Sequence, residues 1–571
     1  MLRFFFRVAL FQSLVLLAVV HAALSIPSRE DNDARSAMIS ATAALIKNEP
    51  RTIAVGDRIF PLFFGPMPTP GTLAFKLRME EAARIQQFPS EIPAFVATTV
   101  VQQVPKMKCL EDYEKLYDLV QSRIERPLSV AIDDESFGYQ RLTSKVMKIR
   151  LVTSKEYDDE ADFELSDDDL SRTCGRDVTW STIVKRKQLF VEDYANVDKW
   201  NDPETSDGQY VPGAVGFYCY NRETKELLPI EIQIPSTGLV YSPLDTESEW
   251  TLAKMALNAA TVSYHQWQHM VDTHMVVIPL RVEFMRNMAA HHPVRALVEN
   301  HAAIDFGYEV VVSKVLLTPN SSLDRTFGWG AAGSAQFVAD QTNSTISLLN
   351  TLPVDLEDRG LDNIPVFKYG KYTSKLFVAM HDFVDSFVDA YYKDDATVAN
   401  DFELQNWAKA SAKVPHLHDF PCEIESKSHL SQLLTHLIYL CTIRHHSMNS
   451  LAGWHMMAVP YSAPALWKAM PEEKLKEGEE IDLMEYVMPV DRTAELLALA
   501  ALFHRVPREN ETLAETYHVE PFASEPKLKD AINAFHKAMK KIDKSIERRE
   551  RHEAQPYDVL RPSKMPADTW I

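Results

Sequence analysis

The sequence predicts a mainly α-helical fold, with a large single domain, minor β-strands and long central helices, one of which contains a π-bulge. The run from Glu249 to Met288 carries this prediction, because its apolar residues follow helical spacing over far more than the length of an average helix. Its apolar and histidine positions lie on more than one face, which is typical of a helix buried on all sides. Long helical patterns dominate the chain after Trp250 and favour one large domain over several small ones.

The composition is that of an ordinary globular protein. It has 571 residues, of which 46% are hydrophobic and 25% are charged, and its formal net charge is -20. A nucleic-acid-binding surface needs clustered Lys and Arg, so this balance argues against a nucleic-acid partner. We expect a monomer.

The N-terminus has the features of a secretory signal peptide. A positive region precedes the apolar run from Val8 to Val20, which is short for a bilayer span, and Ala22 is a small residue suited to cleavage. We predict a signal peptide over residues 1–22, with a membrane anchor as the alternative, and a mature domain over 23–571. The sequence shows no second apolar run of membrane-spanning length, so we expect a secreted, extracellular protein without a transmembrane segment.

Three Asn-x-Ser/Thr sequons agree with secretion, because each would mark a surface loop if glycosylated: Asn320, Asn343 and Asn510. The five cysteines lack CxxC spacing, which disfavours a zinc ribbon or a redox motif. One or two disulfides are expected, and the odd count leaves at least one free thiol. Cys441 lies in an apolar helical run and is expected to be a buried hydrophobe.

The remaining elements follow from apolar spacing along the chain. Residues 30–105 mix short helical stretches with Pro-rich loops, and residues 130–245 are strand-like and are expected to pack at the edge of the helical part. The clearest strand-like runs are Gln188–Val191, Gly216–Tyr220 and Leu228–Ile232. Further helices are expected over Ser428–Leu451, Arg492–Phe503 and Lys527–His552.

Histidines and the chain end form a candidate metal site. His269 and His274 are five residues apart, which places them about 140° apart around a regular α-helix. They converge on one metal only if the helix is locally widened, as in a π-bulge. His445 and Asn449 are four apart and are expected to share a helix face without distortion. With the carboxylate of Ile571, these groups make a mixed nitrogen and oxygen set that suits iron or manganese better than a structural zinc.

Two alternatives compete with this interpretation. Buried histidines bonded to backbone groups are common, and the chain has nineteen histidines. A zinc protease is the other alternative, since His265 and His269 have HxxxH spacing. That class needs a Glu after the first His as its general base, and Gln266 cannot accept a proton, so the protease is disfavoured.

Several ordered motifs resemble the lipoxygenase family. The segment Trp250-Thr251-Leu252-Ala253-Lys254 precedes the pattern His269-x4-His274-x17-His292-x8-His301, and Thr435 lies ten residues before His445, as in T-x9-H-x3-N. Further landmarks occur in the family's order: Phe137 to Leu142, Tyr391-Tyr392, Asp401 to Trp407, and the tail from Pro556 to Ile571. The resemblance covers residues 130–571.

The resemblance implies a set of site residues. The metal ligands would be His269, His274, His445, Asn449 and the terminal carboxylate of Ile571. His265 would be a neighbour that does not bind the metal, and His292 and His301 would be structural. Positions that line the substrate channel correspond to Val312, Leu316 and Leu323, and the two leucines have core packing as their alternative role.

The chain departs from the family pattern at three places. The family usually has HQ or HE five residues before its first ligand, whereas His265 is four residues before His269. Ser450-Leu451-Ala452 replaces the frequent F-G-Q after the Asn ligand. These two changes put in doubt how the metal is tuned more than whether it binds. Val312 stands where Ala or Gly is usual, so no regio- or stereochemistry is predicted.

The resemblance implies a secreted dioxygenase that adds O2 to polyunsaturated fatty acids such as linoleate. In that chemistry a metal-bound hydroxide removes a hydrogen atom from the doubly allylic carbon, O2 adds to the radical, and a hydroperoxide is released. Too few residues precede the motifs for the family's N-terminal β-sandwich, as in secreted fungal members that often hold manganese. Manganese is therefore favoured and iron stays open. The alternatives are a fatty-acid-binding relative with weak or no dioxygenase activity, and a hydroperoxide isomerase.

Overall fold

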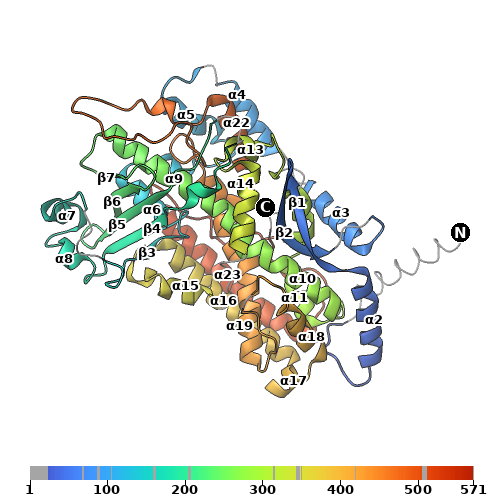
Figure 1. The fold of residues 1–571 in the computed structure, drawn as a ribbon. Coiled ribbons are helices and arrows are strands. Elements are labelled where there is room, and N and C mark those ends of the chain that lie inside the picture. Colours follow the sequence, from blue (N-terminus) through green and yellow to red (C-terminus); the bar gives the residue numbers. More distant parts are fainter. Residues whose placement is uncertain are drawn as a thin grey trace.

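The computed structural model describes residues 23–66, 70–86, 91–103, 106–157, 163–203, 208–312, 316–342, 348, 350–417, 419–503 and 511–569. The expected signal peptide, the sequons at Asn343 and Asn510, and the terminal Ile571 lie outside these residues. Helices make up most of the described chain, and the strands are few and short (Figure 1). The predicted mainly helical fold class is therefore confirmed.

One long helical path crosses the middle of the molecule. It consists of α9 (Glu247–His269), the π-helix η4 (Met270–His274) and α10 (Met275–Asn287) (Figure 1). Thr246 begins it with a capping box, since its side chain accepts from the Glu249 backbone while Glu249 reaches back to the Thr246 backbone. Nearly every side chain of α10 up to Met285 is buried. The predicted helix over Glu249–Met288 and its π-bulge are thus both present.

A second helical path packs beside the first and is more broken than the sequence predicted. It runs through α19 (Lys427–Tyr439), a second π-helix η7 (Leu440–Arg444), α20 (His445–Met448) and α21 (Ser450–Met456). Asn449 interrupts it with an extended backbone, at φ -123° and ψ -159°. Helical elements therefore cover the predicted segment Ser428–Leu451, but it is not one continuous α-helix, because a π-turn and an extended residue interrupt it.

A five-stranded antiparallel sheet lies at one end of the molecule, in the order β3-β4-β5-β6-β7 (Figure 1). Its strands are β3 (Arg150–Leu151), β4 (Leu189–Tyr194), β5 (Ala214–Asn221), β6 (Glu226–Ile234) and β7 (Leu239–Tyr241). The three strand-like runs of the sequence fall in β4, β5 and β6, as predicted. A disulfide between Cys174 and Cys219 ties α7 (Asp167–Cys174) to β5, and Cys441 is fully buried, as expected.

A β-hairpin near the N-terminus was not predicted. Strands β1 (Asn48–Val55) and β2 (Arg58–Pro66) pair in antiparallel register, with Val55 opposite Arg58. The two residues between them are Gly56 and Asp57, and Gly56 has a positive φ of 59°. Gly-Asp between two apolar runs is a hairpin signal, because glycine adopts the left-handed conformation that a tight turn requires. The signal was present in the sequence, but Pro-rich neighbours obscured it.

The other helices surround these central paths. The N-terminal ones are α2 (Asn32–Leu45), α3 (Leu73–Gln86), α4 (Glu91–Val101), α5 (Leu110–Val120), η2 (Leu128–Val130) and α6 (Asp134–Arg141). Those beside the sheet and after α10 are α8 (Trp180–Ile183), η3 (Val197–Trp200), α11 (Pro293–His301), α12 (Asp305–Val311), α13 (Ser322–Thr326), α14 (Gly330–Thr342), α15 (Leu352–Asp358), η6 (Leu361–Asn363), α16 (Lys368–Tyr391), α17 (Asp395–Ala399) and α18 (Phe402–Ser411). The last are η8 (Leu483–Glu485), α22 (Val490–Phe503), η9 (Pro526–Leu528) and α23 (Lys529–Glu550), so the helices expected over Arg492–Phe503 and Lys527–His552 are confirmed.

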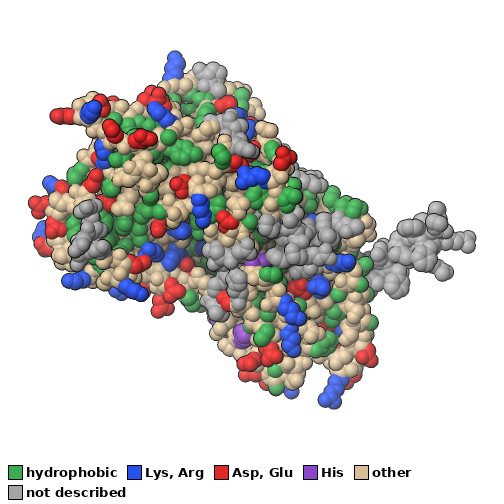
Figure 2. Space-filling view, in the orientation of Figure 1, with side chains coloured by type: hydrophobic (Ala, Val, Ile, Leu, Met, Phe, Trp, Pro, Cys, Tyr) green, Lys and Arg blue, Asp and Glu red, His purple; other side chains and the backbone are tan. Residues whose placement is uncertain are grey.

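The surface carries mixed charge. On the face in Figure 2, Lys and Arg side chains are interspersed with Asp and Glu side chains rather than gathered into one basic surface. Among the helices of the described residues, none is long and apolar enough to cross a bilayer.

Candidate metal centre

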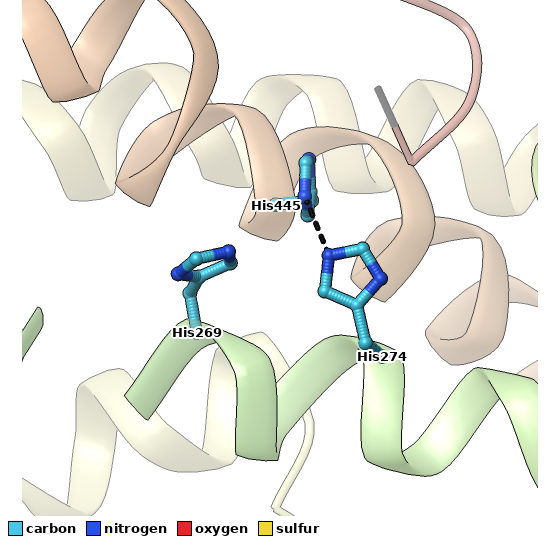
Figure 3. Close-up of side chains that lie close together, drawn as sticks. All are labelled: His269, His274 and His445. Carbon is cyan, nitrogen blue, oxygen red and sulfur yellow. Dashed lines mark hydrogen bonds between the residues drawn. The ribbon is translucent and has the colours of Figure 1, made fainter. Parts of the chain in front are cut away.

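The first π-helix brings two histidines to the same side of the central helix. His269 ends α9 and His274 ends η4, and their ring centroids are 5.7 Å apart. A π-turn adds a residue to the helical turn and so removes most of the angular offset that a regular helix imposes on a five-residue spacing. The side chains therefore leave the helix on a common face, as Figure 3 shows.

His445 approaches the same point from the second helical path. Its Nε2 lies 3.1 Å from Nε2 of His274, and its ring centroid lies 5.4 Å from that of His269 (Figure 3). One nitrogen from each of the three rings lies within 4.8 Å of the other two, and all three side chains are buried. Two nitrogens bound at right angles to one ion at about 2.1 Å would be separated by about 3 Å. The spacing of His274 and His445 thus fits two ligands of one ion.

The hydrogen bonds of the rings determine which nitrogens face the centre. Nδ1 of His274 lies 3.1 Å from Oδ1 of Asp305, and Nδ1 of His269 contacts the carbonyl oxygen of Gln266. A carboxylate and a carbonyl can only accept, so each Nδ1 carries the proton and each Nε2 presents a lone pair. In this form, Nε2 of His269 and Nε2 of His274 can each donate a lone pair to a cation.

Burial favours the neutral form of His269 and His445. Desolvation, together with the neighbouring His274, lowers the pKa of His269 to about 3. The pKa of His445 is also lowered well below its usual value, first by desolvation and then by His274 and His269. Metal ligation requires neutral imidazole, so these rings are ready to bind a metal without losing a proton first.

Asn449 joins the histidine cluster from the point where the second helical path is interrupted. Its Nδ2 lies 3.1 Å from Nε2 of His269, and its Oδ1 is buried without a hydrogen-bond partner among the described residues. A buried amide oxygen without a partner lowers the stability of the fold. A metal ion at the centre of the cluster would be a suitable partner for it. The prediction that His445 and Asn449 share a regular helix face is wrong. Asn449 reaches the site because the helix stops at Met448 and the backbone turns, with Ser450 at φ 52°.

His265 and Gln266 are engaged elsewhere. Nε2 of His265 accepts from the backbone N–H of Met147 at 3.1 Å, and its Nδ1 lies 2.8 Å from the carbonyl oxygen of Thr261. Both ring nitrogens are therefore used, which agrees with the expected non-ligand role. Gln266 donates to the carbonyl oxygen of Met448 at 3.1 Å and so links the two helical paths next to Asn449. This amide link was not expected after the changed spacing.

The described end of the chain lies against the same site. His301 contacts the carbonyl oxygen of Ala567 through Nδ1 and the hydroxyl of Tyr517 through Nε2, and its own carbonyl accepts from the backbone N–H of Thr569. The Thr569 hydroxyl donates to Asp305 at 2.9 Å, which is the carboxylate bonded to His274. Thr569, the last described residue, is thus connected to His274 through one shared carboxylate.

The other predicted positions lie outside the histidine cluster. His292 caps α11 through Nδ1, and its Nε2 lies 3.0 Å from Asp401, so it makes structural contacts as expected. Val312 and Leu323 are buried in the main core, and Leu316 is partly buried against it. Asn320 lies in an exposed turn with φ 63°. The channel and glycosylation roles stay predictions.

The family model described as Lipoxygenase matches residues 132–557. The chain belongs to the lipoxygenase family. It is 26% identical over 505 residues to the manganese lipoxygenase of Colletotrichum gloeosporioides (strain Cg-14), across 83% of this chain and 80% of that protein. It is 26% identical over 475 residues to the human polyunsaturated fatty acid lipoxygenase ALOX12, across 80% of this chain and 69% of that protein.

Solved lipoxygenase structures share the fold. The structure of manganese lipoxygenase of Gaeumannomyces graminis superposes with a TM-score of 0.84 at 22% identity, and it covers 96% of this chain and 100% of that chain. At this sequence identity the superposition shows a shared fold and nothing about function. The expected lipoxygenase-like helical architecture is thus confirmed, and the family implies a non-haem metal at the site.

Proposed function

We propose that this lipoxygenase adds O2 to polyunsaturated fatty acids of the linoleate type and releases fatty-acid hydroperoxides. The convergence of His269, His274 and His445 in a buried site carries this proposal, because it gives the chain a place for one redox-active ion. The manganese lipoxygenase and the human fatty acid lipoxygenase among its relatives agree with it. No observation favours the fatty-acid-binding or isomerase alternatives.

The residues that would hold the metal are the three histidines, Asn449 and the carboxylate of Ile571. When bound, the ion supplies the one-electron redox change that hydrogen-atom removal from a doubly allylic carbon requires. The chain's own groups present neutral nitrogen donors, and the Asp305 carboxylate orients His274. Burial keeps bulk water from the centre, which protects a radical from side reactions. Val312, Leu316 and Leu323 would form part of the apolar wall that holds the fatty-acid chain.

The metal we propose is manganese, with iron as the second possibility. Three nitrogens with amide and carboxylate oxygens suit either ion. The fungal manganese lipoxygenase among the relatives favours manganese. Elemental analysis of the protein, purified after expression with both metals supplied, distinguishes them: a content of one manganese per chain is expected, and one iron per chain would correct the assignment.

Secretion is part of the proposal. The Cys174–Cys219 disulfide supports an oxidising compartment, where such bonds form and persist, and the exposed Asn320 turn is accessible to glycosylation. We propose a secreted monomer whose leader, residues 1–22, is removed. Intact-mass analysis of the protein secreted by a eukaryotic host tests it, since an N-terminus at Met1 would contradict leader removal.

Two adjacent histidines provide a matched test of the activity. His445 and His446 are each 1% exposed, but Nε2 of His446 contacts the carbonyl oxygen of Val559 instead of the cluster. His445→Ala is expected to abolish metal retention and conjugated-diene formation from linoleate. His446→Ala is expected to retain both, at some cost in stability. Equal loss of metal in the two variants, or full metal content without hydroperoxide in the unmodified protein, would overturn the proposed function.

A further inference from the structure

An ion pair joins the two π-helices from which the histidine ligands emerge. Nη2 of Arg444, the last residue of η7, lies 2.9 Å from Oδ2 of Asp272 in η4. The other carboxylate oxygen of Asp272 accepts from Nε2 of Gln268 at 2.8 Å, so the carboxylate is held in place from both sides. Arg444 directly precedes His445, and Asp272 lies two residues before His274.

The pair is neither on the open surface nor fully enclosed. Its side chains are 15% and 21% exposed, and they line a cavity of about 70 Å³ that is also bounded by Asp355, His436 and Tyr439. A charge-assisted hydrogen bond in such a setting is stronger than one in bulk water, because few water molecules compete for it. The pair is therefore able to contribute a real attraction between the helices.

The site needs an attraction of this kind. Nε2 of His274 and Nε2 of His445 lie 3.1 Å apart, and when both carry lone pairs, as metal binding requires, the two rings do not draw their helices together. In the absence of metal, the Gln266–Met448 hydrogen bond and the Asp272–Arg444 ion pair are polar links across this junction. A change in the separation of η4 and η7 moves both histidines directly, since the paired residues are within two positions of them.

We propose that Asp272 and Arg444 are positioning residues that hold the two π-helices at the separation at which His274 and His445 can bind one ion. The proposal rests on the proposed function, because it assumes that the cluster holds a metal. A preorganised site spends less of its binding free energy on closing the helices around the ion. Loss of the pair should thus reduce metal affinity more than it reduces folding stability.

The experiment is a double-mutant cycle on the apo-protein, with Mn²⁺ affinity measured by chelator competition. Asp272→Asn and Arg444→Gln should each weaken Mn²⁺ binding by about 10- to 100-fold, the range typical of groups that orient metal ligands. The double variant should bind no worse than the weaker single variant, because the second change removes an interaction that is already lost. The electron paramagnetic resonance spectrum of bound Mn²⁺ should change in the same variants, since it reports ligand geometry.

Glu495→Gln is a matched control. Glu495 of α22 pairs with Arg325 of α13 through two hydrogen bonds of 2.7 and 2.9 Å, with both side chains 28% exposed, yet the pair does not link the π-helices. It should lower thermal stability and leave Mn²⁺ affinity and the spectrum unchanged.

Each outcome decides between the two levels of the proposal. If the unmodified protein binds Mn²⁺ and the single variants bind it equally well, or if their effects simply add, the positioning role is overturned while the proposed function stands. If Glu495→Gln weakens binding as much as Asp272→Asn, the effect is general destabilisation and the positioning role is again overturned. If the unmodified protein binds neither Mn²⁺ nor Fe²⁺, both proposals fail.

Discussion

Nδ1 of His274 lies 3.1 Å from the carboxylate of Asp305, and that same carboxylate accepts a hydrogen bond from Thr569 near the end of the chain. Asp305 begins α12, and the two backbone N–H groups that follow it, of Phe306 and Gly307, donate to Glu81 of α3. Glu81 in turn pairs with Arg281 of α10. One carboxylate thus connects the orientation of a histidine to the placement of the C-terminal segment.

We predict that Asp305→Ala lowers metal affinity by about 10- to 100-fold, because it removes the group that fixes the tautomer of His274 and supports its basicity. Chelator competition measures the loss. Asp305→Asn should be less severe, since its amide oxygen can still accept from Nδ1 but carries no charge. Circular dichroism should report a helical fold in both variants, and a metal affinity unchanged in Asp305→Ala would show that the contact has no influence on the site.

Removal of Ile571 should abolish metal retention while most of the helical circular dichroism persists. The described tail is anchored without that residue, through the contacts of Ala567 and Thr569 with His301 and of Thr569 with Asp305. We therefore expect these contacts to hold the tail in the truncated protein, whereas the metal would lose a charged ligand. As a control, Ile571→Val keeps the terminal carboxylate and should keep the metal. Full metal content in the truncated protein would contradict the assignment of the terminal carboxylate.

His265→Ala should cost stability and spare the metal. The change leaves the backbone N–H of Met147 without its acceptor and opens a cavity. A buried donor without a partner lowers the free energy of unfolding by about 1–3 kcal/mol. His269→Ala should lose the metal at a smaller cost in stability, since Nε2 of His269 faces the cluster. Urea unfolding and elemental analysis of both variants make the comparison. Equal metal loss would mean that the ligand register is shifted by one turn.

Much of this site could be predicted from sequence, because spacing alone constrains it. A five-residue separation of His269 and His274 requires a widened helix if both bind one ion, and η4 supplies it. The four-residue separation of His445 and Asn449 looked sufficient in a regular helix, so neither the π-helix η7 nor the break at Asn449 was anticipated. The same spacing of residues is compatible with a regular helix, a π-turn or an interrupted helix. Packing against the first helical path determines which of these forms.

The residues that hold the ligands in position could not be predicted from the sequence, for a different reason. Asp305, Glu81 and Arg444 are distant in sequence from the residues they contact, and an isolated Asp or Arg carries no periodic signal. Their partners follow from tertiary packing alone. The Gly56-Asp57 turn, by contrast, was readable as a hairpin and could have predicted β1 and β2.

The C-terminal segment should also give the protein a defined acid sensitivity. Arg561 donates to Asp543 of α23 at 2.8 Å, and the backbone N–H of Ser563 donates to the same carboxylate at 2.9 Å. Burial raises the pKa of Asp543, but these donors outweigh it and hold the pKa below its ordinary value. A carboxyl group with a depressed folded-state pKa stabilises the fold fully above its unfolded pKa of about 4, and this contribution is lost as the pH falls through the folded value.

We therefore expect Asp543→Asn to lower the thermal midpoint at neutral pH, and the difference from the unmodified protein to shrink as the pH is lowered below about 4. Differential scanning calorimetry across pH 3 to 7 measures it. Lys427, which pairs with the exposed Asp389, offers a control, since Asp389→Asn removes an ion pair whose carboxylate is 66% exposed and should change the midpoint little. A difference for Asp543→Asn that grows toward acid would reverse the sign argued here and would mean that the folded state raises the pKa of this carboxyl group.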